Sequence, residues 1–228
     1  MNNINETLQN VPLGQKSDYI TQYDPSLLFS IARKVKRDEI NVPTQLPFYG
    51  FDIWNAYEVS WLNQKGKPIV ALLEFVVPCD SINLVESKSI KLYLNSFNNT
   101  KFENFDVVES TIQKDLSVAA NNNVDVKLIG IEQLQQNRLI TFGGECIDDI
   151  DIECDTYLTE PSFLSSDKNN IIEETVYSNL LKSNCLVTNQ PDWGSVQIHY
   201  KGPAIDKTGL LKYIVSFRNH NEFHEQCV

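Results

Sequence analysis

Residues 51–77 read FDIWNAYEVSWLNQKGKPIVALLEFVV, and this stretch decides the fold of the first half of the chain. Aromatic residues and alternating polarity predict a strand over 51–62. Residues 63–68 (NQKGKP) are rich in turn formers. Residues 69–77 are apolar apart from Glu74, which indicates a second, central strand. The stretch therefore predicts a β-hairpin.

Two amphipathic helices and a further strand are predicted after this hairpin. Apolar residues recur at helical spacing over 86–97 and again over 104–120. Residues 124–131 return to a strand pattern. Residues 1–48 are polar and interrupted by prolines, so we expect an N-terminal arm with one short helix near 26–32. The first module, residues 49–142, is thus expected to be strand, strand, helix, helix, strand.

The second half of the chain repeats this plan in part. Strands are expected over 171–181 and 195–200, and a helix over 206–217. At an offset of 120 residues the same or similar residues recur in these pairs: Glu86 and Asp206, Tyr93 and Tyr213, Ser96 and Ser216, Phe97 and Phe217, Asn99 and Asn219. This weak repeat predicts a second module over 171–228, joined to the first by an acidic linker over 143–170. We expect this second module to be incomplete, because the chain ends where its second helix should begin.

Composition and charge exclude several classes of protein. No apolar stretch reaches the length of a membrane span, and the N-terminus has no secretory signal, so we expect a cytoplasmic protein without membrane contact. The five cysteines are odd in number and lack C-x-x-C spacing, which argues against a disulfide framework or a cysteine zinc site. A net charge of -11 repels nucleic-acid phosphates, so direct binding of DNA or RNA is not expected.

The first of three chemically suggestive clusters is ESKSIKLY at 86–93. Ser87 and Ser89 supply hydroxyls, and Lys88 and Lys91 supply ammonium groups, within the first turns of a predicted helix. A helix N-terminus also offers free N–H groups and a positive dipole. The cluster therefore predicts a binding site for a nucleotide phosphate. The alternative is an ordinary helix start with solvated lysines.

The second cluster is SNCLVTNQPDWGS at 183–195. It places Cys185 seven residues before Asp192, in a turn-rich segment between two apolar runs. A thiolate is a strong nucleophile, and it needs a nearby proton donor when the group it attacks gains negative charge. Cys185 and Asp192 therefore form a candidate nucleophile and acid, although a single cysteine is more often structural.

The third cluster is HNEFHEQC at 220–227. His220, His224 and Cys227 share one face if the segment is helical, which could bind zinc, but the H-E-x-x-H pattern is absent. In the other reading, Phe223, His224 and Glu225 line a pocket for a flat polar ring, with Phe stacking and Glu accepting paired N–H donors. Neither G-x-G-x-x-G nor a Walker A sequence occurs, so a Rossmann or P-loop nucleotide site is not expected.

Together the three clusters resemble the NADPH-dependent 7-cyano-7-deazaguanine reductases, the nitrile reductases of queuosine biosynthesis in tRNA modification. Residues 86–93 match the family's helix sequence at every position, 183–195 resemble its cysteine loop, and 223–225 its ring-binding segment. The likeness is closest to the long, two-module form. It implies an α+β fold of tandem tunnelling-fold (T-fold) modules, with antiparallel sheets and paired helices on one face, assembled as a homodimer.

The resemblance also implies roles for individual residues. Cys185 would form a covalent thioimide with the nitrile carbon of 7-cyano-7-deazaguanine, and Asp192 would protonate the nitrogen. His224, grouped with these catalytic residues, would close the pocket with Phe223. Two NADPH molecules would deliver two hydrides in turn.

Substrate and cofactor contacts are implied on the same grounds. The substrate ring would contact Glu86, Ser87, Phe223 and Glu225. NADPH would contact Ser87, Lys88, Ser89 and Lys91.

Two alternatives stay open at the level of the sequence. One is a zinc-dependent pterin-type cyclohydrolase on the same fold, using His220, His224 and Cys227. The other is an inactive fragment of the reductase, because long members of the family continue beyond the position that corresponds to Val228.

Overall fold

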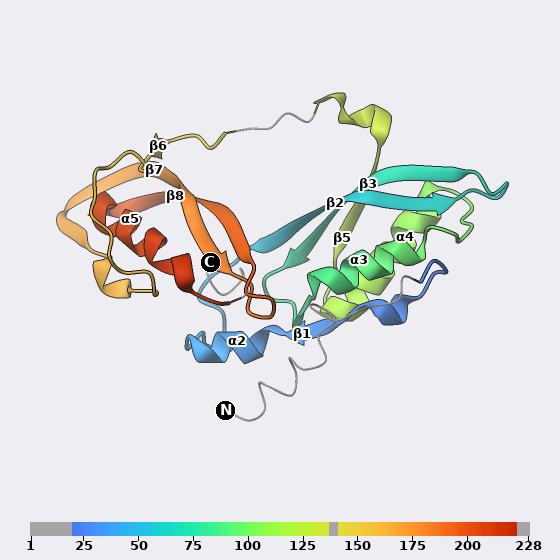
Figure 1. Ribbon diagram of the computed structural model, residues 1–228, viewed down its shortest axis with the longest axis horizontal. Coiled ribbons are helices and arrows are strands. Elements are labelled where there is room, and N and C mark those ends of the chain that lie inside the picture. Colours follow the sequence, from blue (N-terminus) through green and yellow to red (C-terminus); the bar gives the residue numbers. More distant parts are fainter. Residues whose placement is uncertain (1–19, 137–140, 223–228) are drawn as a thin grey trace. The chain divides into compact units, whose positions relative to one another are not determined.

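The hairpin predicted over 51–77 lies at the centre of the first of two units. A computed structural model describes residues 20–136 and 141–222, and the chain divides into residues 1–137 and 138–228. In the first unit β2 (Phe51–Leu62) pairs with β3 (Pro68–Pro78), which pairs with β5 (Asp125–Gly130), all antiparallel (Figure 1). The order β2-β3-β5 confirms that the most apolar strand is central.

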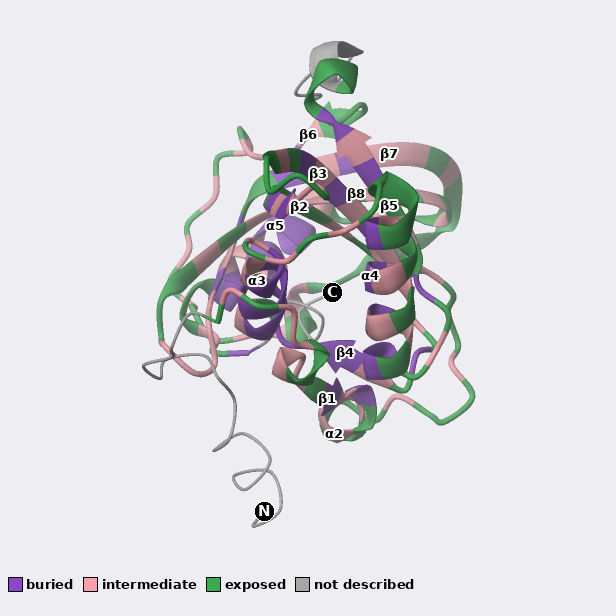
Figure 2. Cartoon of the chain, turned by 90° about the vertical axis from the view of Figure 1, so that its right-hand side faces the viewer, coloured by how far each residue is buried: buried purple, intermediate pink, exposed green. Residues whose placement is uncertain are grey.

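Helices α3 (Ser87–Ser96) and α4 (Phe105–Ala120) cover one face of this sheet (Figure 1). Both lie within one residue of their predicted ends. Buried residues lie along one side of α4 and exposed residues along the other (Figure 2). The core between sheet and helices contains these large, fully buried side chains: Val59, Trp61, Leu73, Phe75, Tyr93, Phe97, Ile112 and Leu116.

The N-terminal segment differs from the prediction of a short helix near 26–32. A 3₁₀ turn, η1 (Pro25–Leu27), leads into strand β1 (Ser30–Ala32), and helix α2 (Arg33–Glu39) begins only afterwards. Strand β1 pairs antiparallel with β4 (Asn83–Val85). Ile31 is buried on this short strand, so its tertiary contacts, rather than local propensity, set the backbone.

The second unit contains one long hairpin with a helix packed against it. Strand β7 (Ser166–Asn184) pairs with β8 (Pro191–Ile205), and both are longer than predicted. Helix α5 (Lys207–Ser216) is followed by the 3₁₀ turn η4 (Phe217–Asn219). The helix predicted over 206–217 is confirmed, because Asp206 and Phe217 are its N-cap and C-cap residues.

Residues 143–170, expected to be an acidic linker, are part of this second unit. Strand β6 (Glu145–Cys146) pairs in parallel with β7, and η3 (Pro161–Phe163) follows before β7 begins. Ile147 is fully buried, and Ile150 and Ile152 pack against the same core. Acidic residues lie between these isoleucines in the sequence, so the apolar pattern that attaches the segment to the sheet was not recognised.

The two units share local geometry at positions related by the 120-residue offset. The rings of Tyr93 and Phe97 meet edge to face at 5.1 Å and 83°. Those of Tyr213 and Phe217 do so at 5.1 Å and 84°. Side-chain contacts of the same kind therefore end α3 and α5.

A serine near the end of each helix holds a 3₁₀ turn in the same way. The Ser96 hydroxyl donates to the Tyr93 carbonyl and accepts the Asp24 N–H, beside η1. The Ser216 hydroxyl donates to the Tyr213 carbonyl and accepts the Glu160 N–H, beside η3. The likeness of the two units thus extends upstream of the repeat that the sequence revealed.

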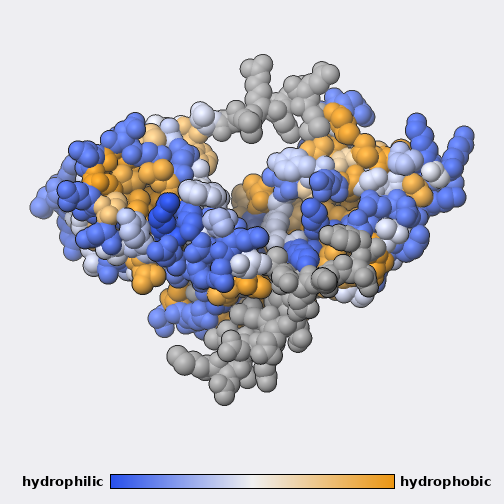
Figure 3. All heavy atoms as spheres, in the orientation of Figure 1, coloured by the Kyte–Doolittle hydropathy of each residue, from blue (hydrophilic) through white to orange (hydrophobic). Residues whose placement is uncertain are grey.

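The sheet face of the first unit that α3 and α4 do not cover carries exposed apolar residues. Phe51, Ile53 and Val70 are each more than half exposed there, and apolar side chains reach the surface in Figure 3. Among the described helices, none combines the length and the apolar character needed to span a bilayer.

Candidate functional site

The loop between β7 and β8 presents Cys185 at the tip of a closed hairpin. The Cys185 N–H donates to the Gln190 carbonyl at 2.8 Å, and the Asn189 N–H donates to the Cys185 carbonyl at 3.0 Å. Asn189 has a left-handed backbone (φ 56°), which Asn tolerates better than most residues. The thiol is free and partly exposed. This is the accessible setting that a reactive thiol requires.

Asp192 lies at the start of β8, at the same end of the hairpin as Cys185. Its cross-strand partner is Ser183, and the next pair toward the loop is Asn184 with Pro191. Directly opposed residues of an antiparallel ladder point to the same face, so Asp192 shares the buried face of Ser183. Side chains two apart on a strand also share a face, which predicts that Cys185 continues it.

The segment after η4 is attached to the edge of β7 beside the cysteine loop. The Asn184 N–H donates to the His220 carbonyl at 2.8 Å, and the Glu222 N–H donates to the Asn184 carbonyl at 3.1 Å. The Asn221 amide also bridges Asn184 and Asn189. The chain is therefore held next to Cys185 as far as residue 222. Phe223, His224 and Glu225, the predicted ring-binding residues, lie outside the described residues.

The zinc interpretation depended on a helical face through His220, His224 and Cys227. His220 has an extended backbone (φ -76°, ψ 130°), because the 3₁₀ turn ends at Asn219. His224 and Cys227 lie outside the described residues. Within residues 20–136 and 141–222, no group of three or more His, Cys, Asp or Glu side chains is placed to hold a metal.

The outer face of the same hairpin carries cations that the sequence did not reveal. The Arg218 guanidinium lies 5.9 Å from the centre of the exposed Trp193 ring. The Lys182 ammonium donates to the Arg218 carbonyl and to Asn184 Oδ1, each at 2.6 Å. Lys182 and Trp193 are cross-strand partners, so the alternation of β7 and β8, had it been recognised, would have grouped them.

In the first unit, Glu86 is the N-cap residue of α3 and is almost fully buried. Its Oε1 accepts the Lys88 N–H and its Oε2 accepts the Ser89 N–H, both at 2.8 Å. The free N–H groups expected at this helix start are therefore largely occupied by the protein's own carboxylate, which also meets the positive end of the helix dipole.

The predicted nucleotide-binding residues of α3 differ in access. The Ser89 hydroxyl is buried, donates to the Glu86 carbonyl and accepts the Phe29 N–H. Ser87 and Lys91 are exposed, and Lys88 is half-buried. Ser89 thus holds the helix start together, whereas Ser87 and Lys91 are available to a ligand.

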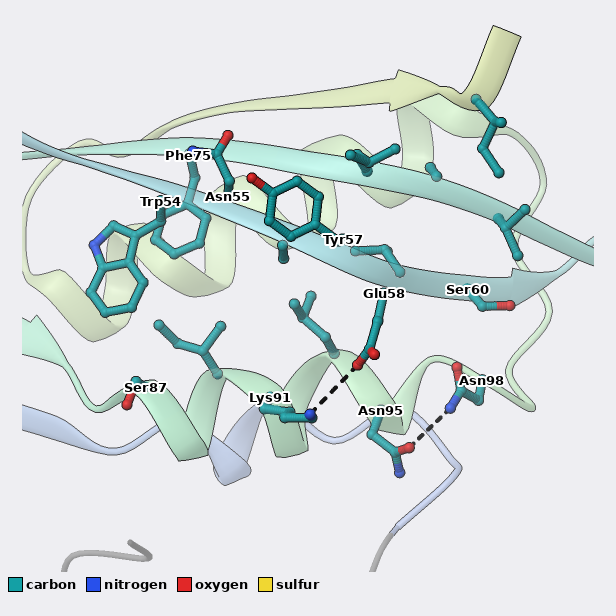
Figure 4. A pocket seen from close by; sticks show the side chains of 18 residues that line it. Trp54, Asn55, Tyr57, Glu58, Ser60, Phe75, Ser87, Lys91, Asn95 and Asn98 are labelled. Atoms are coloured by element: carbon teal, nitrogen blue, oxygen red, sulfur yellow. Dashed lines mark hydrogen bonds and ion pairs between the residues drawn. The ribbon is translucent and has the colours of Figure 1, made fainter. Parts of the chain in front are cut away.

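Ser87 and Lys91 line a cavity of about 680 Å³ between α3 and the β2-β3 hairpin (Figure 4). Asn95, one helical turn after Lys91, continues its polar side along α3, and Asn98 follows just beyond the end of the helix. The Lys91 ammonium lies 3.5 Å from Glu58 Oε2, and both side chains are largely exposed. The cavity has the size of a small-molecule site, with a cation and amide donors along one wall.

A β-bulge in β2 shapes the opposite wall. Tyr57 and Glu58 together face one residue of β3, because the register shifts between Ala56 and Val59. The bulge turns Glu58 toward Lys91 in Figure 4. Sequence reasoning assigned no role to Tyr57 or Glu58, and a bulge leaves little trace in an alternating pattern.

Comparisons with known proteins indicate the same family over nearly the whole chain. The family model for "Nitrile reductase, 7-cyano-7-deazaguanine-reductase N-term" matches residues 19–128, and that for "QueF-like protein" matches 191–228. A curated "NADPH-dependent 7-cyano-7-deazaguanine reductase" of Cupriavidus metallidurans is 56% identical, covering 95% of this chain and 79% of its own. Proteins of the same name from Azoarcus sp. (56%; 95% and 77%) and Paraburkholderia xenovorans (54%; 97% and 81%) are similar.

Proposed function

The chain belongs to the family of NADPH-dependent 7-cyano-7-deazaguanine reductases, and we propose that it reduces the nitrile of that base to an aminomethyl group. It is an NADPH-dependent oxidoreductase. One nitrile, two NADPH and two protons give one primary amine and two NADP⁺. The product is 7-aminomethyl-7-deazaguanine, a precursor in the modification of tRNA with queuosine.

The proposed first step is covalent. The Cys185 thiolate adds to the nitrile carbon, one π electron pair moves to nitrogen, and the Asp192 carboxyl protonates that nitrogen to give a thioimide. The partly exposed position of Cys185 at the hairpin tip and the place of Asp192 at the same end of the ladder support this assignment. His224 remains a proposed third participant.

The proposed substrate-ring contacts come from two sources. Phe223 and Glu225 follow the segment that is attached beside Cys185, which supports their role in holding the ring. Glu86 and Ser87 are the other proposed contacts. Glu86 Oε1 accepts the Lys88 N–H and, at 3.5 Å, the Ser87 hydroxyl, whereas Oε2 accepts the Ser89 N–H and keeps capacity for another donor.

The cavity beside α3 is proposed to hold part of the cofactor. When bound, NADPH supplies hydride. The donors at this cavity suit an anionic, hydroxyl-rich ligand: Ser87 and Lys91, with Asn95 beyond them. Lys88 is proposed to contribute from the first turn, and Ser89 to act by fixing that turn.

Assembly and location are also proposed. Tandem T-fold modules that associate as a homodimer would cover the exposed apolar residues Phe51, Ile53 and Val70. A cytoplasmic location would keep the thiol of Cys185 reduced. No direct role for nucleic acid is proposed, given the net charge of -11.

The observation that carries the mechanism is the free, partly exposed thiol at the tip of a hairpin whose next strand starts with Asp192. Intact-protein mass spectrometry after incubation with 7-cyano-7-deazaguanine tests it without NADPH. We expect a mass increase of one ligand in the wild type and none in Cys185→Ala. Cys154→Ala, at another free and partly exposed cysteine, is the matched control and should keep the adduct. An adduct that persists in Cys185→Ala would refute the assignment.

A further inference from the structure

Ser183 carries a buried hydroxyl with no hydrogen-bond partner among the described residues. An unsatisfied buried hydroxyl costs free energy, and native proteins contain few of them. Ser178 lies on the same strand and is equally buried, but its hydroxyl accepts the Leu180 N–H at 3.1 Å. The hydroxyl of Ser183 therefore stands out among the serines of β7 as a polar group that the fold does not use.

The position of Ser183 suggests what the hydroxyl serves. It is the direct cross-strand partner of Asp192, and opposed side chains on one face have Cβ atoms about 4.5–5.5 Å apart. The Asp192 carboxyl also makes no hydrogen bond or ion pair with any residue in the described part of the chain. Serine and aspartate side chains at that Cβ separation are long enough for a hydroxyl and a carboxyl oxygen to reach hydrogen-bond range.

We propose that Ser183 is a positioning residue for the reaction: its hydroxyl donates to the Asp192 carboxyl and holds it toward the substrate nitrogen. The proposal rests on the proposed function of Cys185 and Asp192. Once Asp192 has given its proton to the nitrogen, its carboxylate is the stronger acceptor, and the hydrogen bond from Ser183 strengthens as the thioimide forms. The Ser183 hydroxyl keeps its own proton, so the proton that reaches the nitrile nitrogen still comes from Asp192 and the atoms of the addition step balance as before.

Nearby charged groups do not replace this contact. Lys182 and Asn184 point to the opposite face of β7, where Lys182 binds the Arg218 carbonyl. Glu222 lies across the edge of β7, bonded through its N–H to Asn184. Among the described residues, Ser183 is therefore the side-chain donor that lies directly opposite Asp192 and on the same face of the sheet.

The test measures the rate of thioimide formation and the melting temperature of Ser183→Ala. Rapid mixing with saturating 7-cyano-7-deazaguanine, without NADPH, gives the rate constant, and a concentration series gives the affinity. We expect the rate constant to fall about tenfold or more, as for the loss of a hydrogen bond to a charged group, with little change in affinity. Tm, measured without substrate, should equal or exceed that of the wild type, because the removed hydroxyl has no partner among the described residues of the ligand-free protein.

Matched variants separate positioning from a structural role. Ser178→Ala loses a hydroxyl that accepts an N–H, so its Tm should fall while its rate constant stays near that of the wild type. Ser183→Thr keeps the hydroxyl and should recover most of the rate. In an Asp192→Asn background, Ser183→Ala should cause no further loss, because both changes remove one interaction.

Several results would overturn the proposal while leaving the proposed function intact. One is a Ser183→Ala rate constant within twofold of the wild type when Asp192→Asn is slow. Another is an equal loss of rate with and without the Asp192 carboxylate. If wild-type protein forms no adduct, or Asp192→Asn reacts at the normal rate, the proposed function itself fails and Ser183 has nothing to position.

Discussion

Tyr93→Phe tests how the helix that carries Ser87 and Lys91 is fixed to its unit. Asp115 on α4 accepts two hydroxyl hydrogen bonds at the same oxygen, from Tyr23 at 2.8 Å and from Tyr93 at 2.7 Å. Tyr93 is fully buried, and Tyr23 is half-buried. Both rings pack edge to face against Phe97. One carboxylate therefore ties the N-terminal segment, α3 and α4 together.

The expected magnitude follows from this geometry. Phenylalanine keeps the ring and its packing, so Tyr93→Phe removes only the hydrogen bond. A hydrogen bond to a charged group contributes about 1.5–3 kcal/mol. Tyr23→Phe should cost about 1 kcal/mol, since water partly replaces its donor. Asp115→Ala should cost about 3 kcal/mol or more, because it leaves a buried hydroxyl without a partner.

Alkaline pH provides an independent readout. Burial, and next the hydrogen bond to Asp115, raise the pKa of Tyr93 far above the ordinary value of 10. The folded state therefore keeps a proton that the unfolded state loses. This contribution to stability is complete below about pH 10 and declines above it, by at most about 1.4 kcal/mol per pH unit. Tyr93→Phe should flatten that decline.

Urea unfolding at pH 7 and pH 10.5 measures both effects. In a Trp193→Phe background, fluorescence reports Trp54 and Trp61, which belong to the first unit. Tyr49→Phe, at a residue that is 98% exposed, is the control and should change nothing. A loss below about 0.5 kcal/mol in Tyr93→Phe, or the same loss in the presence of Asp115→Ala, would refute the shared-carboxylate argument.

Three further predictions concern the cavity, the second unit and a helix cap. Glu58→Gln frees Lys91 from its ion pair, so the KM for NADPH should fall several-fold at low salt. Lys91→Gln should raise this KM. An unchanged KM in Glu58→Gln would show that the ion pair does not limit binding of the cofactor by Lys91. Gly209→Ala would bring a Cβ to 2.1 Å from the Phe163 carbonyl oxygen, so it should destabilise the second unit by more than about 2 kcal/mol in urea unfolding. Gly202 has open space around it, so Gly202→Ala is the control and should leave the stability unchanged. Asn104→Ala removes the side chain that caps α4 and should cost about 0.5–2 kcal/mol in urea unfolding, with Asn104→Asp retaining stability.

The spacing of apolar residues along the sequence predicted the helices and strands that bury one face. Residues 51–62 form β2 as predicted, and α3, α4 and α5 begin and end within one residue of their predicted bounds, because alternation and helical spacing directly report the buried side. The strand at Ser30–Ala32 was missed, since its only apolar anchor is Ile31 and its partner β4 lies some fifty residues later.

The candidate site was predictable in part for the same reason. Cys185 and Asp192 were proposed as a pair because a turn between two apolar runs is visible in one stretch of sequence, and the structure places both at the loop end of the β7-β8 hairpin. Ser183 and Glu58 were not. The role proposed for Ser183 depends on cross-strand register, and that proposed for Glu58 on a bulge that changes the phase of β2. Register and bulges are set by pairing with residues elsewhere, so a single strand does not reveal them.

The repeat helps to separate what the fold requires from what the reaction requires. Glu86 caps α3 and Asp206 caps α5 with the same kind of bond to the first turn, so a carboxylate there has a structural explanation in both units.

The exposed side of α3 has no such explanation. At the offset of 120 residues, Lys91 corresponds to Leu211, which is fully buried in the core of the second unit, and Asn95 corresponds to Val215, which packs against that core. The same helix scaffold therefore forms without a polar row, and the cavity beside α3 is an addition to it. For this reason, among the cofactor contacts proposed in the first unit, we favour Lys91 and Asn95, where the two copies diverge, over the capped helix start that the two copies share.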